Sequence, residues 1–417
     1  MNNNSENSTL QLINKLNQSL NSLRFKELWP EFTPFPYALY DNNDVYLVNY
    51  NNPPANYIKL KDNIYKGVRD NNFFGNTAIK FNDAYIAIWN ISAKSNNVSY
   101  KKLTSKLVHE MFHAYQHNIK DNRYGNELLY LTYPFTEDNL ALRLAERKSL
   151  IKTIFADNKN QSINYIEKFI NYREKRRELI GDYIDYELGM ESREGTALYV
   201  EYKSLLQLSE LPEKYLIANF GSDLAGDNQN LKEFRKSCYS SGLFLCLILK
   251  RLAPGWQKAY NNSSKFLYNF LLEHIQYNKE QIAIPESNYS RAIIKRFNEY
   301  KESHFKAFND QQGYKIIING DFKIAGFDPM NIINIDNRLL HKNFVKLSFK
   351  QGQITIKNQA ITKHNENVIE INQIQFYTSH KPEIKDDMVK IKDVGDFKAS
   401  INKKENIFII NIINEFN

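Results

Sequence analysis

Cysteine is scarce in this chain of 417 residues, which has only Cys238 and Cys246. Both fall in one expected helix, where a separation of eight residues (246 − 238) corresponds to about 12 Å along the axis. That distance exceeds the Cα spacing that a disulfide spans. We therefore expect two free core thiols in a reducing compartment, and the count excludes a cysteine-based metal site.

Long hydrophobic runs are also missing. The longest apolar stretches, LFLCLIL at 243–249 and IFIINII at 407–413, are too short to cross a bilayer. The opening MNNNSENST has no basic start followed by an apolar run, which a secretory signal requires. These observations predict a cytoplasmic protein with no membrane partner.

Glycine and proline are few, at 15 and 11, whereas tyrosine and phenylalanine are abundant, at 27 and 26. This balance excludes fibrous and disordered classes and is typical of a globular protein with two or three domains. The formal net charge is +8, but the basic residues are scattered and no nucleic-acid motif accompanies them. We expect no nucleic-acid partner, and the oligomeric state stays open.

The hydrophobic pattern divides the chain into three parts and predicts an α+β protein. Residues 1–25 form an N-terminal helix. Residues 26–310 form the main domain, with short alternating runs at 34–92 that predict a small antiparallel sheet and a helical part at 99–310. Residues 311–417 alternate again in about seven short runs, which predicts an all-β domain of sandwich or barrel type.

Several local signals refine the helical part. Tyr133-Pro134 marks a break, and Thr136 is placed to cap the helix that follows. Long helices are expected at 161–180 and 182–208. Ahead of them, the strand AYIAIWN at 84–90 could bind an extended peptide if it is an edge, whereas an internal strand would have both edges occupied.

Histidines are also few, at 8, yet two of them stand four residues apart in His-Glu-Met-Phe-His at 109–113. On a helix, His109 and His113 project from one face and can hold a single metal ion at about 2.0–2.1 Å. Glu110 is then placed to accept a proton, as in the H-E-x-x-H arrangement of zinc peptidases. The alternative is a helix with two unrelated histidines. His117 lies about 12 Å along the axis from His109 and is expected outside the ligand set.

The segment DYELGMESREGTALYVEY at 185–202 contains acids that can supply a third ligand. Here the sequence resembles the gluzincin metallopeptidases, whose third ligand is a glutamate on a later helix. Glu194-Gly195-Thr196-Ala197-Leu198-Tyr199 has the Glu-Gly-x-Ala-x-Tyr shape of several gluzincin ligand helices. The resemblance implies Glu194 as the third ligand, with Glu191 as the alternative. Small residues after the ligand are expected to let this helix approach the histidine helix.

Tyr239-Ser240-Ser241-Gly242 resembles the Tyr-x-x-Gly of aminopeptidase-type gluzincins, where the tyrosine hydroxyl binds the oxyanion. The alternative is a tyrosine that caps an apolar helix. The Gly-x-Met-Glu-Asn strand that holds a substrate amine in that family is missing, so endopeptidase and aminopeptidase specificity both stay open. Glu187 and Glu191 are the candidates for binding an amine.

The resemblance covers residues 84–260 at the level of motifs. It implies a zincin-like domain and a Zn²⁺-dependent metallopeptidase that acts on peptide or protein substrates. In that hypothesis His109, His113 and Glu194 hold the metal, Glu110 is the general base and Tyr239 stabilises the oxyanion. The competing hypothesis is a catalytically silent zincin-fold scaffold that binds a partner through the β domain.

Overall fold

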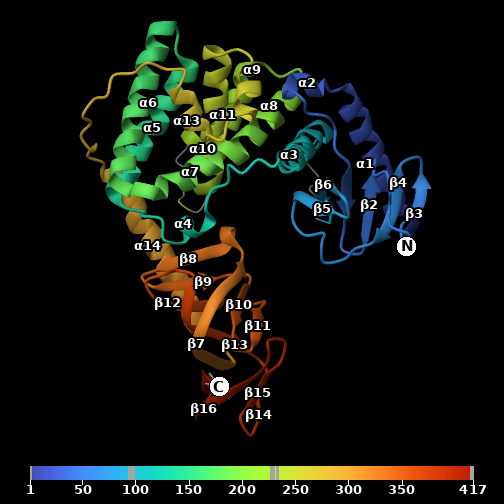
Figure 1. The fold of residues 1–417 in the computed structure, drawn as a ribbon, viewed down its shortest axis with the longest axis vertical. Coiled ribbons are helices and arrows are strands. Elements are labelled where there is room, and N and C mark those ends of the chain that lie inside the picture. The colour runs from blue at the N-terminus through green and yellow to red at the C-terminus, as the bar shows by residue number, and fades with distance from the viewer. Residues whose placement is uncertain (1, 93–98, 226–230, 232–233, 414–417) are drawn as a thin grey trace. The chain divides into compact units, whose positions relative to one another are not determined.

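The computed structural model describes residues 2–92, 99–225, 231 and 234–413 (Figure 1). The fold is mixed α+β, with a small N-terminal sheet, a large helical part and an all-β C-terminal part, which confirms the predicted class at this level. The chain forms two compact units, each made of several segments. The first unit comprises Met1–Gly125, Leu142–Arg176 and Glu187–Ala283, and the second comprises Asn126–Ala141, Arg177–Tyr186 and Ile284–Asn417.

The N-terminal sheet of the first unit has six strands in the order β3-β4-β2-β1-β6-β5. Neighbours pair antiparallel except β1 and β6, which run parallel, so the predicted antiparallel sheet is in fact mixed. The strands are β1 (Tyr37–Tyr40), β2 (Asp44–Val48), β3 (Ile58–Lys61), β4 (Ile64–Val68), β5 (Thr77–Phe81) and β6 (Ala84–Asn90).

Strand β6 has the bounds that the sequence predicted, but it is internal. It pairs with β1 on one side and with β5 on the other. The possibility that residues 84–90 offer an open edge to a peptide is therefore wrong. The hairpin between β5 and β6 turns at Asn82, whose φ of 48° is a left-handed conformation that asparagine tolerates.

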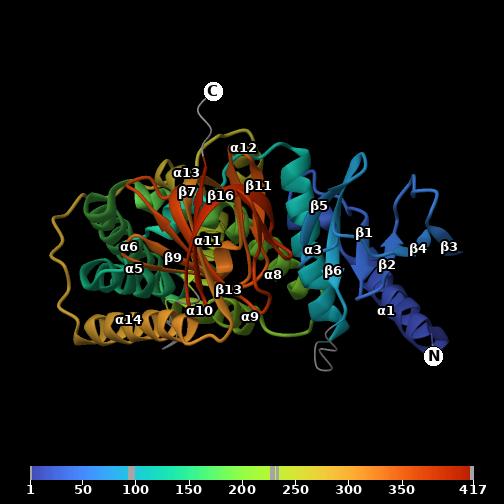
Figure 2. The same cartoon turned by 90° about the horizontal axis from the view of Figure 1, so that it is seen from below.

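Helix α3 (Tyr100–Asn118) carries the two histidines and packs beside β6 (Figure 2). Ser99 caps its first turn, since the Ser99 hydroxyl accepts a hydrogen bond from the Lys102 N–H. The face of α3 next to the histidines is anchored by aromatic contacts. The ring of Phe112 lies 5.1 Å from that of Trp29, which lies 5.2 Å from Trp256. This packing fixes the axis of α3.

Further helices complete the helical part of the chain, and the expected helices at 161–180 and 182–208 are present. The second of these is interrupted by a 3₁₀ turn at Gly181–Tyr183 and by a π-helical turn at Glu191–Gly195. The other helices of this part are α1 (Asn2–Ser22), α2 (Phe25–Leu28), α5 (Glu137–Phe155), α6 (Lys159–Ile180), α7 (Ile184–Met190), α8 (Thr196–Leu208), α9 (Glu213–Phe220), α10 (Ser222–Ala225), α11 (Phe234–Leu252), α12 (Trp256–Asn261) and α13 (Leu267–Leu272).

Two local predictions for this part hold. The Thr136 hydroxyl accepts a hydrogen bond from the Asn139 N–H at 3.3 Å, so it caps α5. Cys238 and Cys246 are both free and buried on α11. Within the part of the chain that the structure describes, every helix is too short or too polar to cross a membrane.

The second unit contains α4 (Glu127–Leu131), α14 (Asn288–Asn309) and an eleven-stranded sheet rather than about seven strands. Its longest strand, β7 (Tyr314–Phe327), pairs with β10, β13 and β17 around a core that includes Ile316 and Ile318. The strands that follow are β8 (Ile332–Ile335), β9 (Arg338–His341), β10 (Val345–Phe349), β11 (Gly352–Ile356), β12 (Ala360–His364), β13 (Glu370–Thr378), β14 (Glu383–Lys385), β15 (Met388–Ile391), β16 (Gly395–Lys404) and β17 (Ile407–Ile412).

Candidate metal centre

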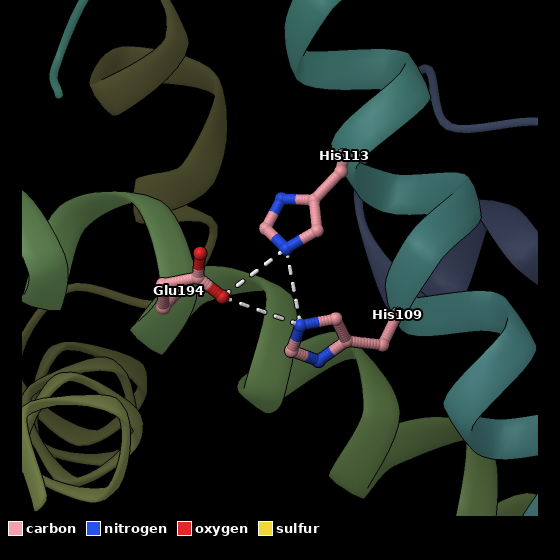
Figure 3. Close-up of side chains that lie close together, drawn as sticks. All are labelled: His109, His113 and Glu194. Atoms are coloured by element: carbon pink, nitrogen blue, oxygen red, sulfur yellow. Dashed lines mark hydrogen bonds and ion pairs between the residues drawn. The ribbon is translucent and has the colours of Figure 1, made fainter. Parts of the chain in front are cut away.

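Two histidines of α3 and one glutamate of the π-helical turn converge on one point of the first unit (Figure 3). The Nε2 atoms of His109 and His113 are 3.1 Å apart. Glu194 Oε2 lies 3.2 Å from the Nε2 of His113 and 3.5 Å from the Nε2 of His109. The three residues named from the sequence as metal ligands are thus brought together, with both imidazoles buried.

Hydrogen bonds fix the tautomer of His113. The Gln116 side-chain N–H group donates to the Arg193 carbonyl at 3.0 Å, and a carbonyl can only accept. The Gln116 Oε1 atom therefore faces the His113 Nδ1 at 2.8 Å, which must carry the proton. In neutral His113 the Nε2 lone pair is then directed at Glu194.

A carboxylate stands behind the other imidazole. Glu201 Oε2 lies 3.1 Å from His109 Nδ1, within ion-pair distance but at an angle that does not make a good hydrogen bond. Because a carboxylate only accepts, it favours a proton on Nδ1 and leaves Nε2 as the ligand atom. Metal-binding histidines commonly have such an acceptor behind them.

The donor set fits a zinc ion. Bonds of about 2.0–2.1 Å in a tetrahedron place neighbouring ligand atoms about 3.3–3.4 Å apart. The observed separations of 3.1, 3.2 and 3.5 Å bracket that value. Two imidazole nitrogens and one carboxylate oxygen match the ligand types of catalytic zinc, with a fourth position left for water or substrate. Without a positive charge, these lone pairs would repel one another.

The ionisation of the group reflects the same convergence. Burial opposes protonation of His109, but the Glu194 and Glu201 carboxylates outweigh it and raise the pKa of His109 well above its usual range. Burial likewise opposes ionisation of Glu194, but the His113 and His109 imidazoles hold the pKa of Glu194 well below its usual range. A site that favours a proton on His109 and a negative charge on Glu194 also favours a metal cation in the same place. The proton and the metal ion therefore compete for His109.

Glu194 sits in the π-helical turn, and its neighbour Gly195 packs against Gly242 of α11. The expectation that small residues let this helix approach the histidine helix is therefore wrong for Gly195, which faces α11. π turns occur frequently at functional sites. Here the turn joins the Glu194 ligand closely to the helix that carries Tyr239.

The other acids of the segment have different partners. Arg173 donates to both carboxylate oxygens of Glu191, at 2.6 and 2.7 Å, and the Ser241 hydroxyl bonds to the same carboxylate. Glu187 is paired with Arg143 and Arg176. Both acids are thus held by buried arginines, which favours Glu194 over them as the third ligand.

Glu110 lines a cavity of about 340 Å³ together with His109 and Tyr239. Burial raises the pKa of Glu110 above its usual range, although the two neighbouring imidazoles act in the opposite direction. A carboxylate with a raised pKa is a stronger base than one in water. Its place beside the candidate ligands suits proton transfer.

Tyr239 also faces this cavity, and its hydroxyl accepts a hydrogen bond from the Arg235 Nε at 3.0 Å. The Arg235 guanidinium lies 3.8 Å from the Glu194 Oε1 atom. Arg235 therefore links the candidate metal ligand to the candidate oxyanion donor. Since Tyr239 is the acceptor in this bond, the bond does not use the tyrosine's own hydrogen.

His117 lies outside the ligand group, as its distance along the helix predicted. Its Nε2 atom accepts a hydrogen bond from the Arg193 guanidinium at 2.8 Å, and its ring stacks on Tyr85 at 5.0 Å. Burial and the nearby Arg193 charge lower the pKa of His117 to about 4. A neutral imidazole in this place orients Arg193.

Sequence reasoning missed Gln116 and Arg235 as members of the site, and it considered Glu201 only as one of four acids able to bind the metal, not as the acceptor behind His109. Gln116 stands three residues after His113, a spacing that places side chains side by side on a helix, so its role could have been suspected. Glu201 is a full two turns beyond Glu194 and could have been paired with it in the same way. Arg235 depends on how α11 meets the π-helical turn, which no local pattern encodes.

Comparisons of the chain with protein-family models, with curated proteins and with solved structures found no match in any of the three.

Proposed function

We propose that the first unit is a zincin-like, zinc-dependent peptidase that hydrolyses peptide bonds. The observation that carries this proposal is the convergence of the His109, His113 and Glu194 ligand atoms within 3.5 Å, with Glu110 in the adjoining cavity. The motif order, from the H-E-x-x-H helix to the glutamate segment to the tyrosine helix, supports the same reading.

In this proposal His109, His113 and Glu194 hold the zinc ion. When bound, the ion would supply a Lewis acid and lower the pKa of a coordinated water to about 7. Glu110 accepts a proton from the attacking water and delivers it to the leaving amine, a role that its raised pKa favours. Gln116 and Glu201 hold the imidazoles in the tautomer that leaves Nε2 as a ligand.

Tyr239 is assigned the stabilisation of the oxyanion. Its hydroxyl lines the cavity with Glu110 and accepts a hydrogen bond from Arg235, which makes the phenol a better donor toward developing negative charge. Loss of one such donor typically lowers kcat by about 10²–10³-fold. Tyr239→Phe is therefore expected to lower kcat by that factor and to leave bound zinc unchanged.

The test compares wild type with Glu110→Gln and with Glu210→Gln, a control that makes the same chemical change at an exposed position. Bound zinc is measured after purification without added metal, and a mixed peptide library is screened for new termini. We expect stoichiometric zinc in all three proteins and cleavage only in wild type and the control. Zinc without cleavage would support the silent scaffold instead, and absence of zinc would overturn the proposal.

A further inference from the structure

The cavity beside the candidate metal centre contains groups that the proposed chemistry does not use. Its lining includes Lys106 of α3 and Trp89 of β6, and Leu198 and Phe220 add apolar surface. All four side chains are partly exposed. A substrate bound at the metal centre would therefore meet a cation, an indole ring and two apolar side chains.

Lys106 is held toward the cavity by the indole of Trp89. Its ammonium lies 5.9 Å from the ring centroid, which is cation–π distance. Lys106 stands one helical turn before Glu110, a spacing that allows an ion pair. Among the described residues, however, Lys106 has no acidic side chain within ion-pair distance. Its charge is thus available to a ligand.

The acids of the cavity have other tasks. Glu201 lies against His109, and Glu110 is the proposed general base. Asp223 and Lys236 also line the cavity and add one formal charge of each sign. Lys106 is the remaining cation of this lining, in the part of the chain that the structure describes.

We propose that Lys106, positioned by Trp89, binds a carboxylate of the substrate. This inference rests on the proposed peptidase function, because it names the substrate class of the same site. A compact ammonium recognises a carboxylate as a point charge, and Leu198 and Phe220 can cover the aliphatic part of the substrate residue. The carboxylate comes either from an acidic side chain or from the C-terminus of the peptide, and the two sources share the same chemistry.

The experiment uses the full chain with zinc and four matched peptides, which carry Glu or Gln at one position and end in a free or an amidated C-terminus. The proteins are wild type, Lys106→Gln, Lys106→Glu and the control Lys102→Gln, which removes an exposed charge one turn earlier on the same helix. We expect Lys106→Gln to lower kcat/KM about tenfold for one carboxylate-bearing set only. Lys106→Glu should reverse the preference, so that the Gln-containing or amidated peptide is cleaved better than its carboxylate-bearing match. If the Glu peptides lose their higher kcat/KM, the carboxylate comes from an acidic side chain. If the peptides with a free C-terminus lose it, the carboxylate is the C-terminal one.

Binding provides a readout separate from turnover. The same peptides are titrated into Glu110→Gln with and without Lys106→Gln, and the change in dissociation constant is measured. Cleavage with no dependence on peptide charge in any variant would overturn the subsite and leave the peptidase standing. Binding that depends on Lys106 without cleavage in wild type would support the subsite and overturn the peptidase. If Lys102→Gln and Lys106→Gln changed kcat/KM and the dissociation constant equally, the cause would be the net charge of the protein, and the subsite would be overturned.

Discussion

Gly195 and Gly242 approach each other so closely that a Cβ built on Gly195 would lie 2.4 Å from the Cα of Gly242. This contact joins the π-helical turn that carries Glu194 to the helix that carries Tyr239. Both sides need glycine, because a Cβ on Gly242 would lie 2.4 Å from the Glu191 carbonyl oxygen. Neither neighbour is the end of a flexible side chain, so backbone would have to move.

Gly242→Ala is therefore expected to destabilise the first unit by about 1–3 kcal/mol, the usual cost of overpacking. Because the displaced backbone carries Glu194, zinc affinity should fall as well. Urea denaturation and a zinc-competition titration measure the two effects. Gly326→Ala is the control, since its Cβ would meet only the Lys346 Cβ at 3.5 Å. If Gly242→Ala and Gly326→Ala had the same free energy of unfolding and the same zinc affinity, the close contact between Gly195 and Gly242 would not matter for either property.

Gln116→Leu removes the acceptor for the His113 Nδ1–H group. We expect a 10–100-fold loss of zinc affinity, because such outer hydrogen bonds set the orientation and basicity of a ligand imidazole. The substitution nearly conserves volume, so circular dichroism should show the fold intact. An unchanged dissociation constant for zinc, measured by competition with a chelating dye, would show that Gln116 does not orient His113.

Arg173→Met tests the buried charges behind the π-helical turn. Arg173 is 1% exposed and pairs with both Glu146 and Glu191, so its loss leaves Glu191 without its arginine and Glu146 with Arg176 alone. We expect a loss of about 3–5 kcal/mol in the free energy of unfolding. The matched control, Arg291→Met, removes an exposed pair with Glu137 and should cost less than about 1 kcal/mol. Similar losses in both variants would refute a special role for the buried network.

The second unit should lose stability in acid through His341. This side chain is 1% exposed, and burial lowers the pKa of His341 to about 3. Between that value and the unfolded pKa of about 6.5 the unfolded chain binds the proton and the folded chain does not, so stability falls as the pH falls. At pH 4 the loss reaches about 3 kcal/mol.

His341→Gln keeps a group that can bond to the Thr362 hydroxyl, which lies 2.9 Å from the His341 Nε2, and it cannot titrate in this range. Hydrogen exchange of β9 and β12 at pH 4 and pH 7 is the measurement. We expect the acid-induced increase in exchange to shrink in the variant. An identical increase in wild type and His341→Gln would assign the acid sensitivity to other groups.

Sequence reasoning succeeded where the signal is local. The four-residue spacing of His109 and His113 determines their common face on any helix, and alternation over 84–90 determined the bounds of a strand. The neighbours of that strand could not be predicted, because pairing of β6 with β1 joins segments that are distant in the chain. For the same reason the small sheet was expected to be antiparallel, whereas it is mixed.

The choice of a metal ligand among the acids of 185–202 shows more clearly what the sequence alone could not predict. Four glutamates stand in this one helical segment, and the resemblance alone selected Glu194. What separates them in the structure is the set of partners on other helices. Arg173 and Arg176 of α6 engage Glu191 and Glu187, respectively, while α3 presents its imidazoles to Glu194. No periodicity in this segment specifies those partners.

The π-helical turn at Glu191–Gly195 lets one nearly continuous helical segment direct its glutamates toward two different groups of partners. A π turn holds one residue more than an ordinary helical turn, and each residue of an α-helix advances the side-chain direction by about 100°. The widened turn thus resets the phase between Glu187 and Glu191, which face buried arginines, and Glu194 with Glu201, which face the imidazoles. Deleting one residue from this turn would rotate the helix after it relative to the helix before it. The segment could then no longer pair with the buried arginines and hold the metal ligands at the same time.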